Sequence, residues 1–416
     1  MFHRFFAVEA KVLMKKLMQS SDKSTYLRAG RPVLVAGLVP ALVPYRLFSA
    51  QKSKNRKIMK YTKFIIILLF PLLSIAPVQA LEIVDLAGRT ITVPDKVERI
   101  VALGPGALRL VVYLKAIDKV VGIETIETKS LPPFFRPYSD VCTADITHLP
   151  QIGSGGPGKL PDLEALLACR TQVIFSIGLD LGQIENLQAK TGIPTIILSY
   201  GKLGVWREKA MQSLKLMGKV LNQEARALEI ELFLQQAQAE LSQKTLTTRT
   251  ASPSAYFGGL AYKGIRGLES TEEGYFPGNM VKANNVAGNN PANSGHLFID
   301  KERLLKWNPE IIFLDYSSNH LVSRVYLENR SFYQLLHAVE QKQVYSVLPY
   351  NQYNTNLENA LANAYYIGSK LYPLNFNDLT VEAKIAEIFN FFLSLKIDTV
   401  SLPAYQPFCL KNVACR

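Results

Sequence analysis

One uninterrupted stretch near the middle of the chain constrains the fold most: it runs from Asn222 to Leu241 and reads NQEARALEIELFLQQAQAEL. It contains no Gly or Pro and is rich in Ala, Leu, Glu and Gln, all strong helix formers. Asn222 suits the N-cap of a helix, and Glu224 follows it in the first turn. One buried stripe is predicted at helical spacing by Ala225, Leu228, Leu232 and Ala239. A helix of this length measures about 30 Å, the width of a small domain.

Two similar segments flank this helix at a constant offset of 138 residues: DLEALLACRTQVIF at 162–175 and DKERLLKWNPEIIF at 300–313. Each begins with an Asp suited to cap a short helix and ends in a continuous apolar strand. Such strands are typical of parallel sheets that are buried on both faces. The pattern predicts an α/β fold with a first lobe at 81–202, connecting helices at 203–247, a second lobe at 248–400 and a tail at 401–416.

The formal charge of +13 is concentrated at the N-terminus. Residues 1–80 hold 14 Lys and Arg against 2 Asp and Glu, and the remaining 33 basic residues nearly balance 32 acidic ones. A near-neutral folded part argues against nucleic acid as a partner. Residues 59–80 combine a basic start, an apolar run and the small-x-small sequence Val78-Gln79-Ala80. This predicts a signal peptide cut after Ala80, with 1–58 as an upstream extension that is not native; a retained signal anchor is the alternative.

Export would allow the four cysteines to form disulfides, because disulfides persist outside the cytoplasm. The sequence favours the pairs Cys142–Cys169 in the first lobe and Cys409–Cys415 in the tail, with free thiols as the alternative for each. No pair has the C-x-x-C spacing of metal clusters or thioredoxin-like sites.

Smaller elements complete the prediction. Residues 83–93, IVDLAGRTITV, alternate around Ala87-Gly88 as in a β-hairpin, and Trp206 to Leu221 predicts a helix before the long one. Residues 131–138, LPPFFRPY, are expected to be an extended aromatic loop, and 149–161 an irregular Gly/Pro-rich one.

Ligands of open α/β sheets bind beyond the carboxyl ends of the strands. Here these ends carry Gly104-Pro105-Gly106, Ser176, the loop from Gly258, and Tyr316, which face one cleft if the lobes oppose each other. Arg136 offers a planar fork for a carboxylate or phosphate, and Lys263 a cation for anionic groups. Tyrosines in expected loops add flat area with a hydroxyl group: Tyr138, Tyr262, Tyr275, Tyr350 and Tyr353.

Several motifs in this order resemble the periplasmic solute-binding proteins of ABC importers, of the iron-siderophore/cobalamin type. They are DLAGRTITVP followed by RIVALGPGA, VVGIE, LPQIG, the two repeat segments, and FFRPY, GLAYKG…EST and LPYNQYNTN. The last three contain Arg136, Tyr262, Ser270 and Tyr350 and resemble a branch that binds iron complexes. The resemblance implies two Rossmann-like lobes joined by one long rigid helix, with the ligand in the cleft between them.

The chain departs from this family at two points. Members commonly carry an acidic residue on the helix after the opening strand, which docks on the importer, whereas this chain has Ala107-Leu108-Arg109. The matching region of the second lobe, around Asn279, also lacks one, although Glu272 and Glu273 lie close by. Docking on the permease would then use other residues, and Arg109 is a candidate contact to an anionic ligand in the cleft.

We therefore expect a monomeric periplasmic protein, without an intrinsic cofactor, that delivers an iron chelate to the permease and ATPase of an importer. A bare transition metal would need convergent His and carboxylates, and the five His show no ligand spacing. Haem and cobalamin also suit an aromatic cleft, and a sensor without a transport role is an alternative. No G-x-S-x-G, H-E-x-x-H or P-loop indicates an enzyme, and the cysteine pattern disfavours a metallocluster reductase subunit.

Overall fold

The computed structural model describes residues 80–201, 206–246, 252–288, 295–398, 402, 404–405 and 407–408, all within the compact unit Ile75–Arg416. The predicted extension, the signal peptide up to Gln79, and Cys409 and Cys415 lie outside these residues. Among the helices that are described, none is long and apolar enough to cross a membrane.

The chain enters the fold through the predicted hairpin. β1 (Ala80–Val84) pairs antiparallel with β2 (Thr90–Pro94), and Ile83 lies opposite Ile91. Asp85 closes the turn, because its Oδ1 accepts from the backbone N–H groups of Ala87 and Arg89, both at 3.0 Å. The Leu86 N–H donates to Ile197 O, which ties the hairpin to the first lobe.

The first lobe is built on a four-stranded parallel sheet with the order β4-β3-β5-β6. Its strands are β3 (Ile100–Leu103), β4 (Val120–Gly122), β5 (Val173–Ser176) and β6 (Thr195–Ile197). The lobe also contains α3 (Ala107–Tyr113), α4 (Pro137–Ile146), α5 (Leu163–Ala168) and α6 (Leu181–Thr191). β3 and β5 are buried along their whole length, as their continuous apolar sequences predict.

The second lobe has a mixed sheet with the order β10-β8-β7-β11-β12, and β9 (Asn284–Asn285) also pairs with β7. β7 (Ser254–Gly258), β11 (Ile311–Asp315) and β12 (Val344–Val347) are parallel, whereas β8 (Ser270–Glu273) and β10 (Gly295–Phe298) are antiparallel additions. The helices of this lobe are α9 (Phe276–Met280), α10 (Lys301–Trp307), α11 (Asn319–Glu328), α12 (Arg330–Gln334) and α13 (His337–Glu340).

The sequence repeat has a structural counterpart in each lobe. α5 leads into β5 and α10 into β11, and both helices are capped by the predicted aspartate. Asp162 accepts from two backbone N–H groups and Asp300 from one. In each copy the first Leu of the Leu-Leu pair, Leu166 or Leu304, is buried. The predicted α/β fold with two lobes is confirmed.

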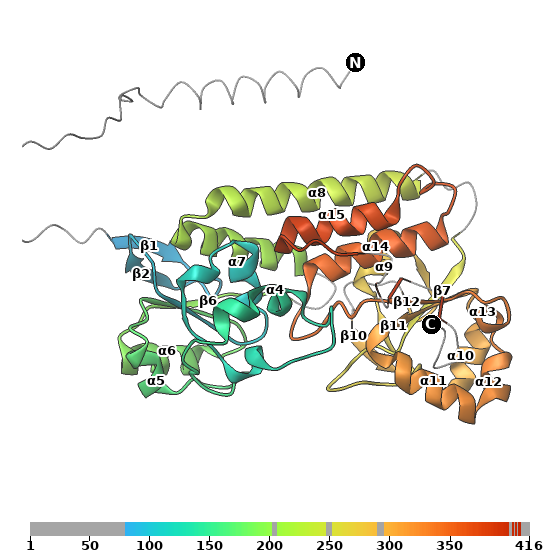
Figure 1. The fold of residues 1–416 in the computed structure, drawn as a ribbon, viewed down its shortest axis with the longest axis horizontal. Helices are drawn as coiled ribbons and strands as arrows, with labels where there is room; N and C mark the ends of the chain where they lie inside the picture. The colour runs from blue at the N-terminus through green and yellow to red at the C-terminus, as the bar shows by residue number, and fades with distance from the viewer. Residues whose placement is uncertain are drawn as a thin grey trace, which may run out of the picture. The chain divides into compact units, whose positions relative to one another are not determined.

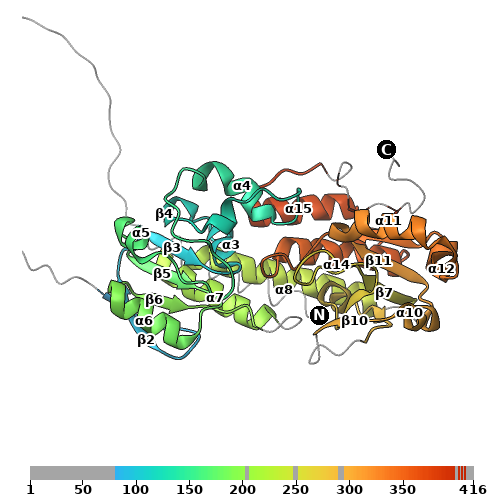
Figure 2. The ribbon, with the colours of Figure 1, turned by 90° about the horizontal axis from the view of Figure 1, so that it is seen from below.

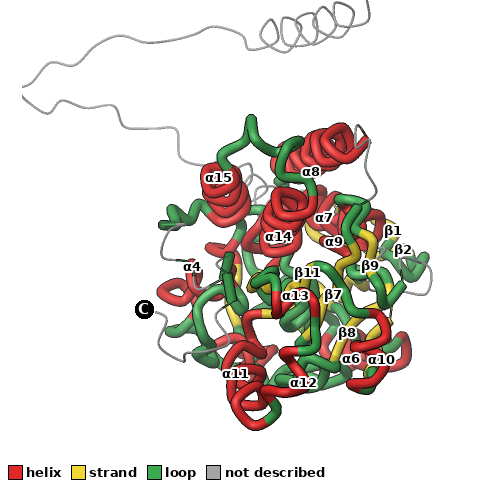
Figure 3. Tube along the Cα trace, turned by 90° about the vertical axis from the view of Figure 1, so that its right-hand side faces the viewer, coloured by secondary structure: helices red, strands yellow, loops and turns green. Residues whose placement is uncertain are grey.

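A helical layer connects the lobes. It consists of α7 (Trp206–Leu221), α8 (Glu224–Leu246), α14 (Leu357–Leu371) and α15 (Val381–Leu393). One sheet lies toward each end of α8 (Figure 1), and Figure 2 shows the same arrangement from below. Figure 3 shows α8, α14 and α15 gathered on one side of the strands of the second lobe.

The long helix is confirmed, but its predicted start and buried face are wrong. Asn222 has a left-handed φ of 56° and ends α7, because the next N–H, of Gln223, donates back to Gly218 O. Leu228 and Leu232 are about half exposed, at 52% and 47%. The buried face instead carries Arg226, Ala227, Ile230, Leu234, Ala237, Leu241 and Thr245.

The aromatic segment 131–138 is only partly a loop. α4 begins at Pro137, a residue well suited to the first turn of a helix because its missing N–H would have no partner there. Tyr138 therefore projects from a helix and is fully buried, which corrects its predicted loop position.

The predicted Cys142–Cys169 disulfide is also wrong, since both residues are free thiols. Cys142 packs in the core cluster that contains Ile100 and Ala102, whereas Cys169 packs with Val101 and Leu103. Alternate residues of a strand point to opposite faces, so the sheet itself separates the two sulfur atoms.

We expect both thiols to resist alkylation in the native protein. Burial raises the pKa of the Cys142 thiol to about 12 and also raises that of Cys169, which disfavours the reactive thiolate. Peptide mapping after iodoacetamide treatment should find Cys142 and Cys169 unmodified before denaturation and modified afterwards. Recovery of a peptide joined through these two cysteines would contradict the structure.

Candidate functional site

The loops that follow strands in the two sheets meet between the lobes. Asn354, in the loop after β12, donates from Nδ2 to Pro105 O in the loop after β3, at 3.2 Å. The ring of Tyr316, directly after β11, lies edge-on to Phe135 with 6.4 Å between centroids. The carboxyl ends of β3, β11 and β12 thus border one interface, called the interlobe site below, which is where α/β sheets bind ligands.

Glycine is required in the loop after β3. Gly104 has a φ of +83°, and a Cβ there would lie 1.9 Å from Ile177 O in the neighbouring loop after β5. The Gly104 N–H donates to Glu124 Oε2 at 2.9 Å. Gly106 has a similar φ of +82° and leads into α3.

Tyr353 of the second lobe reaches the loops of the first lobe through its hydroxyl group. Its hydroxyl oxygen accepts from the Gly156 N–H at 3.1 Å and donates to Glu124 Oε2 at 3.3 Å. Tyr353 and Asn354 have φ values of 53° and 75°, so two successive side-chain-bearing residues occupy the left-handed region. Strain of this kind persists only where the surroundings enforce it, and it concentrates at functional sites.

Glu124 carries unusual electrostatics. Burial raises its pKa to about 7, and the nearby Glu127 adds to the increase, while the Gly104 N–H and the Tyr353 hydroxyl oppose it by stabilising the carboxylate. Its charge therefore changes near neutral pH.

Arg109 joins the lobes from within. Its side chain is fully buried, and its two Nη atoms donate to the carbonyl oxygens of Thr355 (3.0 Å), Gln352 (2.9 Å) and Tyr353 (3.2 Å). The guanidinium also lies over the ring of Tyr138, 4.7 Å from its centroid. Both ends of the fork are occupied by protein carbonyls, so Arg109 holds the Tyr353 loop in place and is not open to an anionic ligand in this state.

Arg136 is likewise paired inside the protein. It forms an ion pair with Glu127 (3.1 Å) and donates to Ile126 O and Lys129 O, both at 3.0 Å. The Tyr138 hydroxyl donates to the same Glu127 oxygen at 2.7 Å. Arg136 lies next to the interlobe site, 5.8 Å from the ring centroid of Tyr353, but its fork is filled.

The structure spreads the remaining predicted contacts through the second lobe. Tyr275 stacks on Phe257 in the core, and the buried Tyr350 donates to Glu272 Oε2 at 2.7 Å. Tyr262 and Lys263 lie in the loop between β7 and β8, and Ser270 is the first residue of β8, which pairs with the edge strand β10. In the first lobe, Ser176 is buried at the end of β5, and its hydroxyl has no hydrogen-bond partner in the described structure.

Comparison with known proteins gives the family. The model of the periplasmic binding protein family matches residues 100–350, which is more than half of the chain. The chain belongs to the periplasmic binding protein family. The resemblance seen in the sequence is thereby confirmed.

Individual relatives of this periplasmic binding protein have low sequence identity to it, but each match covers nearly the whole length of the relative. The molybdate-binding protein MolA of Haemophilus influenzae is 22% identical over 355 residues, covering 80% of this chain and 97% of MolA. The structure of MolA bound to molybdate has a TM-score of 0.60 at 17% identity, covering 76% of this chain and 99% of MolA. FepB of Veillonella parvula, a TroA-like periplasmic binding protein, has a TM-score of 0.58 at 23% identity, covering 76% of this chain and 97% of FepB.

Sequence reasoning missed several groups at the interlobe site of this binding protein. Glu124 was visible as the acidic residue ending VVGIE directly after a strand, but no role was predicted for it. Asn356 and Asn359 donate to Phe135 O (3.2 Å) and Phe134 O (2.8 Å) across the lobes. Several buried polar atoms here have no partner within the described residues: Arg109 Nε, Arg136 Nε, Glu127 Oε1, Asn356 Oδ1 and Asn359 Oδ1.

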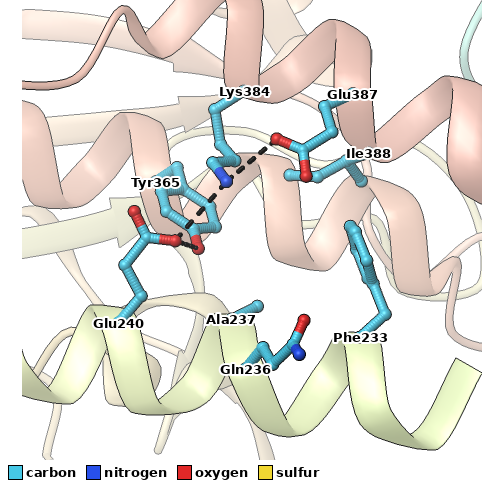
Figure 4. Close-up of a pocket in the computed structure, with 8 residues that line it drawn as sticks. All are labelled: Phe233, Gln236, Ala237, Glu240, Tyr365, Lys384, Glu387 and Ile388. Atoms are coloured by element: carbon cyan, nitrogen blue, oxygen red, sulfur yellow. Dashed lines mark hydrogen bonds and ion pairs between the residues drawn. The ribbon is translucent and has the colours of Figure 1, made fainter. Parts of the chain in front are cut away.

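A small cavity of about 90 Å³ lies elsewhere, between α8, α14 and α15 (Figure 4). Its charged groups satisfy each other: Lys384 Nζ lies 2.9 Å from Glu387 and 3.5 Å from Glu240, and the Tyr365 hydroxyl donates to Glu240 at 2.7 Å. The cavity is part of the helical layer and not of the loops that follow the strands, so we do not assign the solute to it.

Proposed function

We propose that this protein is the solute-binding component of an ABC importer and captures a metal chelate of the iron-siderophore kind between its lobes. In this proposal it resides in the periplasm and hands the chelate to the membrane permease and ATPase. The family supports the binding role, and the signal-peptide pattern of 59–80 supports the location. The observation that carries the proposal is the meeting of loops from both sheets around Tyr353, Glu124 and Gly156.

The polar character of this interface supports a ligand with several oxygen atoms. The Gly156 N–H, the Tyr353 hydroxyl, two asparagine amides and the Arg109 guanidinium converge there, and their hydrogen bonds cross between the lobes. A hydrogen bond between the lobes can be exchanged for one to a ligand at little net cost in free energy, because each takes the place of a hydrogen bond to water. Haem and cobalamin are alternative chelates under the same proposal.

A small oxyanion is the second candidate. The Gly104 N–H already donates to a carboxylate oxygen of Glu124, so this loop holds an oxyanion within the protein itself. MolA, whose name describes it as molybdate-binding, is the relative that supports this alternative.

Calorimetric titration separates the candidates. The purified protein is titrated with a ferric siderophore, haemin, cobalamin and molybdate at the same salt concentration. We expect a dissociation constant below about 1 μM for one of the metal chelates, the range of a specific complex with many contacts. Saturable binding of molybdate alone would favour the oxyanion, and binding of none of the four would overturn the proposal.

Tyr353→Phe tests the position of the site. It removes only the hydroxyl that contacts Gly156 and Glu124, and we expect the bound ligand's affinity to fall about 5- to 10-fold, as for the loss of one hydrogen bond. The matched control is Tyr365→Phe, which removes a hydroxyl bonded to Glu240 in the helical layer and should leave affinity unchanged. Equal affinities for both variants and the wild type would exclude Tyr353 from the site.

A further inference from the structure

A cluster of aromatic side chains is exposed at the edge of the second sheet. The Tyr262 ring stacks on the His296 ring with 4.1 Å between centroids, and Phe298 meets His296 edge-on at 4.5 Å. Tyr262 is 41% exposed and Phe298 56% exposed. We call these three residues the aromatic platform. Burying rings of this size is favourable, so leaving two of them exposed is a cost that a binding surface explains.

The platform lies at the end of the lobe that carries the interlobe site. β8 runs antiparallel to β7, so Ser270, its first residue, lies at the carboxyl end of β7. Phe298 pairs directly with Ser270 across β8 and β10. The carboxyl ends of β7, β11 and β12 lie at the same end of the sheet because these strands are parallel. Figure 1 shows β10 on the side of the second lobe that is nearer the first lobe.

Two cations accompany the rings. Arg266 lies 5.5 Å from the ring centroid of Phe298, and Lys263 lies 5.5 Å from that of Tyr262. In the described part of the chain neither forms a salt bridge with an acidic residue, and Arg266 Nε donates to Tyr262 O at 2.8 Å. A cation held on an aromatic face keeps most of its charge available to an anion.

Hydrogen bonding determines which ring nitrogen of His296, the middle ring of the aromatic platform, carries a proton. The Ser270 hydroxyl donates its proton to Leu260 O at 2.5 Å, so toward His296 Nε2, at 2.7 Å, it can only accept. Nε2 therefore carries a proton. Burial and the neighbouring Arg266 lower the pKa of His296, which leaves the ring neutral and Nδ1 as a hydrogen-bond acceptor. A neutral ring stacks on Tyr262 without repelling the two cations.

We propose that the aromatic platform, with Lys263 and Arg266, binds an anionic aromatic group of the solute, of the catecholate class. This inference rests on the proposed metal-chelate function and narrows it. A catecholate ring stacks on exposed aromatic faces, and its negative oxygens pair with the lysine and the arginine. A hydroxamate chelate offers neither an aromatic ring nor, as the neutral ferric complex, a net negative charge.

The test compares two ferric complexes in calorimetry, a tris-catecholate and a neutral trihydroxamate. Wild type is compared with Lys263→Gln/Arg266→Gln and with Phe298→Leu. We expect the double variant to bind the catecholate complex at least 10-fold more weakly and to bind the hydroxamate complex as wild type does. The matched control is Lys301→Gln/Phe332→Leu, a cation–ring pair at 5.3 Å elsewhere in the same lobe, which should change neither affinity.

The outcomes separate this inference from the function on which it rests. If wild type binds the hydroxamate and not the catecholate, or if the platform variants bind both complexes as wild type does, the platform assignment fails and the chelate function stands. If wild type binds neither complex, the assignment of the solute as an iron-siderophore chelate fails. In that case a titration with iron-free dihydroxybenzoate tests the platform by itself. The His296 ring signals are followed by NMR, and unshifted signals would overturn the platform assignment. Circular dichroism melts confirm that each variant is folded.

Discussion

Replacing Arg109 with methionine should lower the free energy of unfolding by about 3 to 5 kcal/mol, the cost of removing one partner from a buried charged network. Methionine fills similar space but cannot donate, so the carbonyl groups of Gln352, Tyr353 and Thr355 lose their partner in the interior. The loop that presents Tyr353 to Glu124 then loses three of the hydrogen bonds that hold its left-handed backbone. Urea unfolding followed by tryptophan fluorescence and by circular dichroism measures the change.

Two further variants show whether the effect belongs to the link between the lobes. Arg109→Lys keeps the charge but not the planar fork, and we expect it to recover only part of the stability. Arg99→Met is the matched control, because Arg99 also donates to two backbone carbonyls, of Arg170 and Cys169, but is exposed and acts within the first lobe. A loss below about 1 kcal/mol for Arg109→Met, the worth of one ordinary hydrogen bond, would contradict its role as the link.

Glu272→Gln should make the protein more stable at pH 8, by up to about 3 kcal/mol, and leave its stability at pH 4.5 unchanged. Burial raises the pKa of Glu272 to about 7, although the Tyr350 hydroxyl bond favours the charged form. A carboxyl whose pKa is higher in the folded than in the unfolded state stabilises the fold fully below its unfolded pKa. That stabilisation is lost as the pH rises through the folded pKa, here between about 4.5 and 7.

Glutamine imitates the protonated carboxyl at every pH, since each has one donor group and one acceptor oxygen. The measurement is the free energy of unfolding of wild type and variant at several pH values, and the prediction concerns their difference. Glu302→Gln, on the exposed surface of α10, is the control and should give a constant difference. Destabilisation by Glu272→Gln at all pH values would show that the carboxylate is charged in the native protein.

The interlobe site shows where sequence reasoning ends. Tyr353 and the Gly104 loop were predicted to meet a ligand, and they do lie together between the lobes. Arg109 and Arg136 were predicted to bind an anion because a guanidinium fork suits one. The fold supplies both forks with internal acceptors, namely backbone carbonyls and Glu127, and no local pattern reveals acceptors that come from more than 200 residues away in the case of Arg109.

The sequence by itself determined the local elements: the hairpin, the capped repeat units, the buried strands and a long helix. These follow from spacing, capping and the absence of Gly or Pro, which act over a few residues. Only the tertiary structure decided which face of α8 is buried. Arg226 points inward because it donates to Tyr113 O and Phe391 O near the carboxyl ends of α3 and α15, where a cation suits the helix dipole. The tertiary structure likewise placed Cys142 and Cys169 on opposite faces of one sheet, because packing between distant elements is set by the whole fold and not by neighbours in the chain.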